Sequence, residues 1–261
     1  MTYRTILVAE ESGVLTITLN RPERRNAMTP EMQMELLSAM ENAAAGDCRV
    51  VILTGAGDAF CSGLDLTALK GIKDKSAAEY SEDAERIAKL LRTLFELPKP
   101  TIAAVHGAAI AGGTGLAMVC DLTVAVPEAK FGYTEVRIGF VPAIVSAFLA
   151  LQIGDKRARD LLLTGRFFDA AEAYRLGLVN EIVPREQLSA RVRALAEVLS
   201  ANSPASMRAT KRLLAAQNKV WLDAVIAAAM ESNAEARETP DFREGVTAFL
   251  EKRKPKWTQV K

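Results

Sequence analysis

Glycines gather in one stretch of the chain, Thr101–Asp121, whose sequence is TIAAVHGAAIAGGTGLAMVCD. The apolar run Thr101–Val105 predicts a buried strand, and Leu116–Cys120 has the apolar pattern of a helix. A glycine-rich turn at the start of a helix leaves backbone N–H groups unpaired, and negative charge is favoured there. The stretch therefore predicts a site for an anion, or for an oxygen that becomes anionic during a reaction. Close packing of a helix on a strand accounts for it equally well.

Two familiar phosphate-binding loops do not fit this stretch. A P-loop needs Lys followed by Ser or Thr after its last glycine, whereas Gly113 is followed by Thr114 and Gly115. The dinucleotide fingerprint G-x-G-x-x-G is also missing from the run. A second turn rich in small residues, 57–66, follows another short apolar run. Two N–H groups from different turns can converge on one oxygen and form an oxyanion hole.

The overall composition is that of a soluble globular protein. The 261 residues are 49% hydrophobic and 25% charged, and the formal net charge of +1 gives no reason to expect nucleic acid or an anionic membrane as partner. We find no uninterrupted apolar run of transmembrane length and no signal-peptide pattern in the first residues. Three widely spaced cysteines fit neither a disulfide framework nor a zinc site. We therefore expect a cytoplasmic protein.

The elements that must position the two turns alternate along the chain. Residues 4–19 predict a hairpin, and Thr29 followed by Pro30 predicts the start of a helix. Short buried strands then alternate with helices, while residues 67–82 show no clean period. Beyond Glu186 only helical patterns are seen, at 188–199, 205–216, 220–235 and 241–251. This order predicts an α/β fold followed by a helical tail, which covers the core or contacts another subunit.

Five motifs carry a resemblance to a known family. They are NRPERRNAM at 20–28, AFCSGLDL at 59–66, AAVHGAAIAGGTGLAMVCDL at 103–122, FGYTEVRIGFVP at 131–142 and FLEKRKP at 249–255. In this order and spacing the chain resembles the enoyl-CoA hydratase/isomerase (crotonase) family over nearly its whole length. The resemblance implies a crotonase-like ββα spiral core with an acyl-CoA site over residues 1–200. It also implies a C-terminal helical region, 201–261, that serves packing and oligomerisation.

The resemblance further implies the partners and the site. The substrate is an acyl-CoA thioester, the assembly is a homotrimer or a dimer of trimers, and no metal or cofactor is expected. The oxyanion donors match the backbone N–H groups of Cys61 and Gly112. The matching substrate-binding residues are Arg25, Ala27, Cys61, Ser62, Gly63, Leu64 and Gly112.

One position departs from the hydratase pattern. The resemblance implies that hydratases of the family use two glutamates. In this chain the first of these two positions holds Gly115 and the second holds Glu135. Hydration suits two carboxylates, because a water is deprotonated while the alpha carbon is protonated. A single carboxylate suits a 1,3-proton transfer. A site with only the later glutamate resembles that of the Δ3,Δ2-enoyl-CoA isomerases of the family. Isomerisation is therefore slightly favoured, with hydration of 2-enoyl-CoA as the alternative.

Glu135 needs a raised pKa to act near neutral pH, and the aromatic and apolar residues of 131–141 are expected to bury it. It could instead be an exposed loop acid or an ion-pair partner. A second carboxylate for hydration would have to come from one of four acids, Asp65, Glu79, Glu82 or Asp83.

Other activities remain open on the same scaffold. The site could hydrolyse or decarboxylate another acyl-CoA, using open space at Gly115, or the chain could be an idle acyl-CoA-binding subunit. His106 is the single histidine, and we expect a structural hydrogen bond for it. Residues 67–85 and 136–145 are expected to shape the acyl pocket.

Overall fold

The computed structural model describes residues 3–65 and 76–258. Its first sheet has the strand order β1-β2-β3-β5-β7-β10, and β1 and β2 form the predicted antiparallel hairpin. The remaining pairs of this sheet are parallel. The strands are β1 (Ile6–Glu11), β2 (Val14–Leu19), β3 (Val50–Gly55), β5 (Thr101–Val105), β7 (Leu122–Ala125) and β10 (Glu181–Ile182).

A second sheet of short strands lies beside the first. Its order is β4 (Ala59–Cys61), β6 (Ala108–Ile110), β8 (Lys130–Gly132) and β9 (Phe167–Asp169). The chain alternates between the sheets: β3, β5 and β7 belong to the first, and each is followed by a short strand of the second. Successive turns of the chain thus stack as a spiral, and the links between the sheets bring the two glycine-rich turns together.

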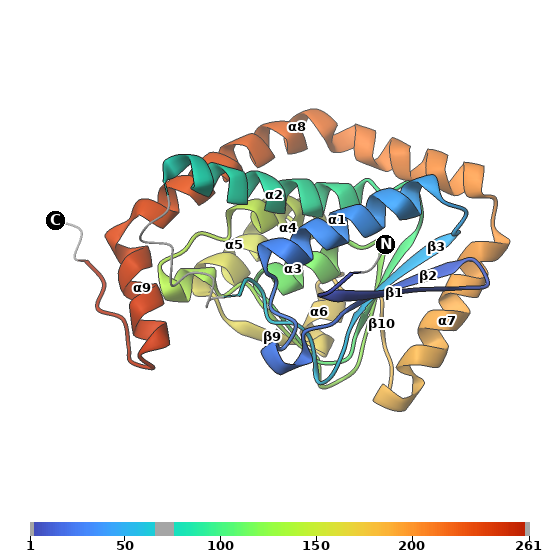
Figure 1. Cartoon of the computed structure of the whole chain (residues 1–261), viewed down its shortest axis with the longest axis horizontal. Coiled ribbons are helices and arrows are strands. Elements are labelled where there is room, and N and C mark those ends of the chain that lie inside the picture. The colour runs from blue at the N-terminus through green and yellow to red at the C-terminus, as the bar shows by residue number, and fades with distance from the viewer. Residues whose placement is uncertain (1–2, 66–75, 259–261) are drawn as a thin grey trace.

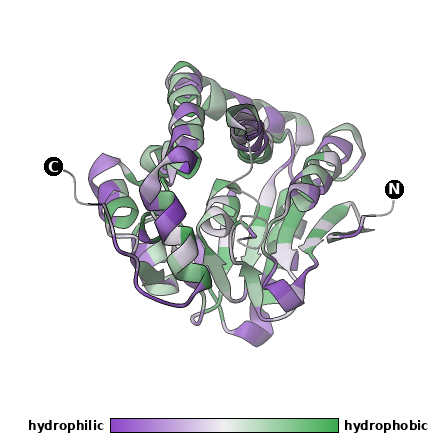
Figure 2. Ribbon diagram, turned by 60° about the vertical axis from the view of Figure 1, so that its left-hand side comes forward, coloured by the Kyte–Doolittle hydropathy of each residue, from purple (hydrophilic) through white to green (hydrophobic). Residues whose placement is uncertain are grey.

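Helices cover both faces of the first sheet (Figure 1). Helices α1 (Pro30–Ala45), α2 (Ala77–Phe95), α3 (Gly112–Val119) and α4 (Ala143–Ile153) gather on one side, while α7 (Arg185–Ala201) packs on β3, β5 and β7. All five residues of β5 are therefore buried. Figure 2 shows hydrophobic residues concentrated on the central strands, with hydrophilic residues more frequent on the outer helices.

The remaining helices follow the spiral. They are η1 (Pro22–Arg24), η3 (Glu135–Ile138), α5 (Asp155–Thr164), α6 (Ala170–Arg175), α8 (Pro204–Glu238) and α9 (Pro240–Leu250). Helix α8 arches over α2 and α4 (Figure 1). Helix α9 contacts η3. The C-terminal helices therefore reach the segment that carries Glu135.

Several sequence expectations are confirmed at the level of single residues. Thr29 caps α1 by accepting a hydrogen bond from the N–H of Met32, and Pro30 begins the helix. Two boundaries differ from prediction. Residues 77–82 belong to α2, because Ser76 and Glu79 form a reciprocal capping box at its start; residues 67–75 lie outside the described range. The two helices expected over 205–235 form the single helix α8, because no glycine or proline separates them.

Helix α8 also has an unusual outer surface. In the described part of the chain it is the one helix whose length and apolar composition would suffice to cross a bilayer. Four of its large apolar side chains are exposed: Leu213, Leu214, Val220 and Trp221. The same composition suits a helix that contacts another protein surface.

Candidate acyl-CoA site

The loop that follows β4 is held by the loop before α1. The N–H of Ser62 donates to the carbonyl of Arg25 over 3.0 Å. The N–H of Met28 donates to the carbonyl of Gly63 over 2.7 Å, and the N–H of Asp65 donates to that of Met28 over 2.9 Å. Residues 62, 63 and 65 are thus hydrogen-bonded to the preceding loop. The N–H of Leu64, which lies between residues 63 and 65, bonds to no described residue.

Buried polar side chains fix these two loops to each other. Asn26, which is fully buried, donates from Nδ2 to the carbonyls of Ala56 and Ala59 over 2.9 and 2.8 Å. Arg21 donates from Nη1 to Asp65 Oδ2 over 2.8 Å. Asp65 is therefore a structural ion-pair partner, and it is not part of the cavity wall.

The second turn approaches the first very closely. A Cβ on Gly113 would lie 2.2 Å from the carbonyl oxygen of Cys61, so only glycine fits at this position. Ala111 precedes α3 with φ +53°, a conformation that L side chains rarely adopt and that costs about 1–3 kcal/mol. This bend places Gly112 at the first helical position, where N–H groups have no partner within the helix.

Leu64 and Gly112 therefore each carry a backbone N–H without a partner among the described residues, and both residues line one cavity. Cys61, which the resemblance identifies as a donor, is placed differently. It lies inside β4, paired with Ala109 of β6, and it is completely buried outside the described wall of that cavity. The donor on the first turn is better matched by Leu64, three residues later.

A buried threonine connects the glycine turn to the strand that precedes Glu135. Thr114 donates from Oγ1 to the carbonyl of Ala109 over 2.6 Å. The same Oγ1 lies 3.1 Å from both the backbone N and the carbonyl oxygen of Gly132. The N–H of Ala111 also donates to the carbonyl of Gly132 over 2.6 Å. These hydrogen bonds fix the positions of α3, β6 and β8 relative to one another. They therefore also position Glu135, which follows β8, relative to Gly112.

Glu135 is the first residue of η3 and points one carboxyl oxygen into the interior. Its Oε2 is buried and has no hydrogen-bond partner. Burial raises its pKa to about 7, because the charged form loses solvation and only its own backbone N–H partly offsets that loss. The structure thus buries one oxygen of this carboxyl group, as expected, although the residue as a whole is only partly buried.

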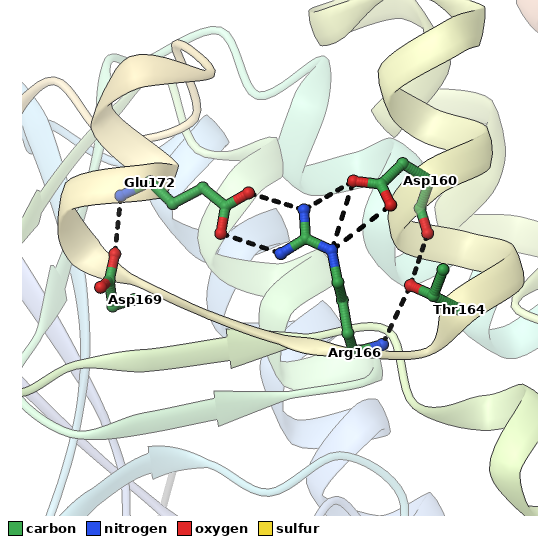
Figure 3. A network of polar contacts seen from close by, with 5 residues as sticks. All are labelled: Asp160, Thr164, Arg166, Asp169 and Glu172. Carbon is green, nitrogen blue, oxygen red and sulfur yellow. Dashed lines mark hydrogen bonds and ion pairs between the residues drawn. The ribbon is translucent and has the colours of Figure 1, made fainter.

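An ion-pair network supports the segment around Glu135. Arg166 lies between two carboxylates and donates to both Asp160 and Glu172 (Figure 3). It joins α5 to α6 and so fixes β9, the strand that pairs with β8. The next residue, Phe167, lines the cavity, and its ring lies 4.8 Å from the guanidinium carbon of Arg137.

Position 115 is closed rather than open. Gly115 is buried, and a Cβ on it would lie 2.6 Å from Cγ1 of Val145. The expected open space at Gly115 is therefore a wrong prediction: the first turn of α4 places Val145 in that space. An acyl-CoA group cannot enter here without moving Val145.

No other acid proposed for hydration lines the described part of the cavity. Asp65 pairs with Arg21, and Glu79 caps α2. Asp83 binds two arginines of the helical layer, and Glu82 is exposed to solvent. Within the residues that the structure describes, Glu135 is the one carboxylate in the cavity wall.

The cavity itself has a volume of about 360 Å³ and is mostly apolar. Four predicted substrate-binding residues line it: Arg25, Ser62, Leu64 and Gly112. Ala27 and Gly63 lie in the supporting loops instead, and Cys61 lies in β4. Sequence reasoning missed three polar wall residues, Gln33, Asn233 and Arg237. No local motif marks them, because they meet only when α1 and α8 pack around the site.

Two reactive side chains have structural roles. The ring Nε2 of His106 lies 3.0 Å from the carbonyl oxygen of Gly57, as expected, and borders a different, larger cavity near α7. Burial raises the pKa of the Cys61 thiol to about 12, so its nucleophilic thiolate is strongly disfavoured.

A spiral of two mostly parallel sheets, with helices packed around it and a helical C-terminal region, is the crotonase fold. The enoyl-CoA hydratase/isomerase family model matches residues 9–260, and the chain belongs to this family of acyl-CoA enzymes.

Individual relatives show the range of names within the family. A Thermus thermophilus protein, named provisionally as an enoyl-CoA hydratase, is 46% identical over 95% of this chain and 98% of its own length. The 1,2-epoxyphenylacetyl-CoA isomerase of Escherichia coli is 34% identical over 97% of this chain and 98% of its own. The crystal structure of an enoyl-CoA hydratase/isomerase from Xanthobacter autotrophicus superposes with a TM-score of 0.89 at 34% identity, covering 97% of this chain and 98% of that one.

Proposed function

We propose that the protein isomerises 3-enoyl-CoA to 2-enoyl-CoA, with Glu135 as the acid–base group. The observation that carries this proposal is that Glu135 is the one carboxylate among the described residues of the cavity wall, while Val145 closes the space above Gly115. A single group that removes and returns one proton suffices for isomerisation, whereas hydration also needs a water to be activated.

The reaction is a balanced 1,3-proton transfer. The Glu135 carboxylate takes a proton from C2, and the electron pair left behind spreads over the C3–C4 double bond and the thioester carbonyl. The resulting oxyanion accepts hydrogen bonds from the N–H groups of Leu64 and Gly112, which are worth several kcal/mol when aimed at developing charge. The protonated carboxyl group then returns the proton to C4, and the double bond comes to lie between C2 and C3.

The proposed donors are Leu64 and Gly112 rather than Cys61 and Gly112. Support comes from the unpaired N–H of Leu64 and from its place in the cavity wall. Arg25 is exposed and also borders the cavity, so it suits contact with the phosphates of CoA at the entrance. The apolar wall beyond suits the acyl chain.

Assay of two substrates tests the proposal. Wild-type protein is incubated separately with 3-enoyl-CoA and 2-enoyl-CoA, and the products are identified by mass spectrometry. We expect a product of unchanged mass from the first and little water addition to the second. The Glu135→Gln variant should lose about 10²–10⁴-fold of turnover. Glu128→Gln, at an exposed position of the chain, is the matched control and should keep full turnover.

Hydration is the second candidate, because several relatives bear hydratase names. A dominant product heavier by one water would favour it and overturn the isomerase proposal. If the wild-type protein binds CoA but turns over neither substrate, an idle acyl-CoA-binding subunit is favoured instead.

The protein is further proposed to form a homotrimer or a dimer of trimers. The exposed apolar side chains of α8 support this, because monomers rarely leave such patches in contact with water. Light scattering of wild type and of a Val220→Glu variant tests it. If the Val220→Glu variant has the same mass in solution as wild type, α8 is not part of the subunit interface.

A further inference from the structure

Three buried polar side chains lie in the wall of the acyl cavity, and the proposed reaction does not use them. They are Gln33 of α1 and Asn233 and Arg237 of α8, with exposed fractions of only 2%, 4% and 3%. Most of the other wall residues are apolar. Burial of polar groups is costly unless hydrogen bonds compensate, so the orientation of these groups is informative.

The arginines fix which end of each amide faces the cavity. Arg86 donates from Nε to Gln33 Oε1 over 2.8 Å, and Arg237 donates from Nε to Asn233 Oδ1 over 3.3 Å. A guanidinium has only donors, so the amide atom that faces it must be the oxygen. The NH₂ groups of both amides are therefore left as donors, and no described residue accepts a hydrogen bond from either.

Arg237 adds a third donor and a positive charge. Its Nη1 donates to Asp83 Oδ2 over 3.1 Å, and its guanidinium carbon lies 5.4 Å from the Phe140 ring centre. Its Nη2 has no hydrogen-bond partner among the described residues. Asp83 also pairs with Arg86, so two guanidiniums share this one carboxylate. We name the set of Gln33, Asn233 and Arg237 the donor cluster.

We propose that the donor cluster binds a carboxylate at the far end of the acyl chain, so that the preferred substrates are CoA monothioesters of unsaturated dicarboxylic acids. This rests on the proposed acyl-CoA function and names its substrate class. Three unused donors, one of them cationic, match the lone pairs of a carboxylate. A plain alkyl end would leave them unpaired in an apolar wall.

The cluster is separate from the reacting group. Burial alone raises the pKa of Glu135, with no guanidinium among the groups that affect it. The contacts of Arg237 are with Asn233, Asp83 and the rings of Tyr80 and Phe140, and no hydrogen bond joins it to Glu135 in the described part of the chain. A chain held at both ends would therefore place its thioester at Gly112 and its carboxylate at a different part of the cavity.

Paired substrates of equal chain length test the proposal. The kcat/KM for 3-enoyl-CoA is compared with that for the corresponding 3-enedioyl-CoA over a series of chain lengths. We expect at least one length at which the dicarboxylic substrate is preferred about tenfold or more, the typical effect of hydrogen bonds to a charged group. Equal or lower kcat/KM for every dicarboxylic substrate overturns the proposal.

Variants connect that preference to the cluster. Asn233→Leu and Gln33→Met keep the approximate volume and remove the donors. Each should abolish most of the preference, because the dicarboxylic kcat/KM falls much further than the monocarboxylic kcat/KM. Arg208→Met, at an exposed site of the same helix, is the control and should keep the preference. Equal loss for both substrates would mean that the cluster is purely structural, and this also overturns the proposal.

Binding measurements separate this proposal from the proposed reaction. Calorimetry with saturated monocarboxylic and dicarboxylic acyl-CoA needs no turnover. If no isomerisation is found but the dicarboxylic ligand still binds more tightly, the proposed reaction fails and the cluster stands. If isomerisation is found and the two ligands bind equally, the cluster fails and the reaction stands.

Discussion

Val145 lies against Gly115 so closely that a Cβ on the glycine would come within 2.6 Å of the valine Cγ1. Position 115, where the hydratase pattern has its first glutamate, thus has no side chain in this chain, and the side chain of Val145 fills the space. A cavity wall whose described residues include one carboxylate suits movement of a proton along the substrate better than activation of a water.

This contact predicts the outcome of restoring a glutamate. Gly115→Glu alone should destabilise the fold by about 1–3 kcal/mol through overpacking and should not create hydratase activity. Gly115→Glu with Val145→Ala should recover part of that stability and add water to 2-enoyl-CoA. Thermal unfolding and product mass measure the two effects, with Val145→Ala alone as control. Hydration by the single Gly115→Glu variant would contradict the idea that Val145 blocks this position.

The pH profile of turnover should report the ionisation of Glu135. The group must be ionised to take a proton, and its pKa is about 7. We expect kcat/KM to rise about tenfold per pH unit well below the pKa and to level off above it. Initial rates in buffers of constant ionic strength provide the measurement. A flat profile down to pH 5 would mean that another group accepts the proton.

The same shift predicts a pH-dependent stability. The pKa of Glu135 is raised from 4.5 to about 7 in the folded protein, so the unfolded chain loses this proton first as the pH rises. The free energy of unfolding should therefore decrease between pH 4.5 and 7, by at most about 3 kcal/mol, and stay constant above. Glu135→Gln cannot ionise and should lack this decrease. Urea unfolding should find the variant equal to wild type at pH 4 and more stable at pH 8.

Local motifs predicted the elements and the main carboxylate well. The Thr29 cap, the hairpin and the buried Glu135 all depend on neighbours in sequence, so pattern and resemblance suffice for them. Pattern and resemblance do not show that Leu64, rather than Cys61, carries the unpaired backbone N–H on the first turn. That assignment depends on which N–H groups the loop before α1 engages, and this becomes visible only in the paired backbone.

Features that join distant segments were not predictable. Val145 reaches Gly115 across 30 positions, because α4 packs on α3. The donor cluster joins α1 to the end of α8, and its side chains have no common motif. Long-range packing sets both, so sequence spacing carries no signal of them.

The N–H of Gly112 can be removed by substitution with proline. Proline is tolerated at the first position of a helix, where the N–H has no partner in the helix. Gly112→Pro should lower kcat by about 10²–10³-fold if that N–H stabilises the oxyanion. Gly112→Ala makes the same contact with the end of Met28 but keeps the N–H, so it should retain most of the activity. Equal losses in the two variants would assign the effect to packing.

The arginines around Asp83 should make this residue far more sensitive than a surface acid. Its side chain is 14% exposed and pairs with Arg237, which is 3% exposed. Asp83→Asn leaves two guanidiniums without their shared carboxylate, and we expect a loss of about 3–5 kcal/mol in the free energy of unfolding.

The matched control is Asp155→Asn. Asp155 pairs with Arg159 on α5, and the two side chains are 75% and 66% exposed. Exposed pairs of this kind contribute about 0–1 kcal/mol. Denaturant unfolding of the two variants compares them directly. Similar small losses would show that solvent or another group replaces the Asp83 carboxylate.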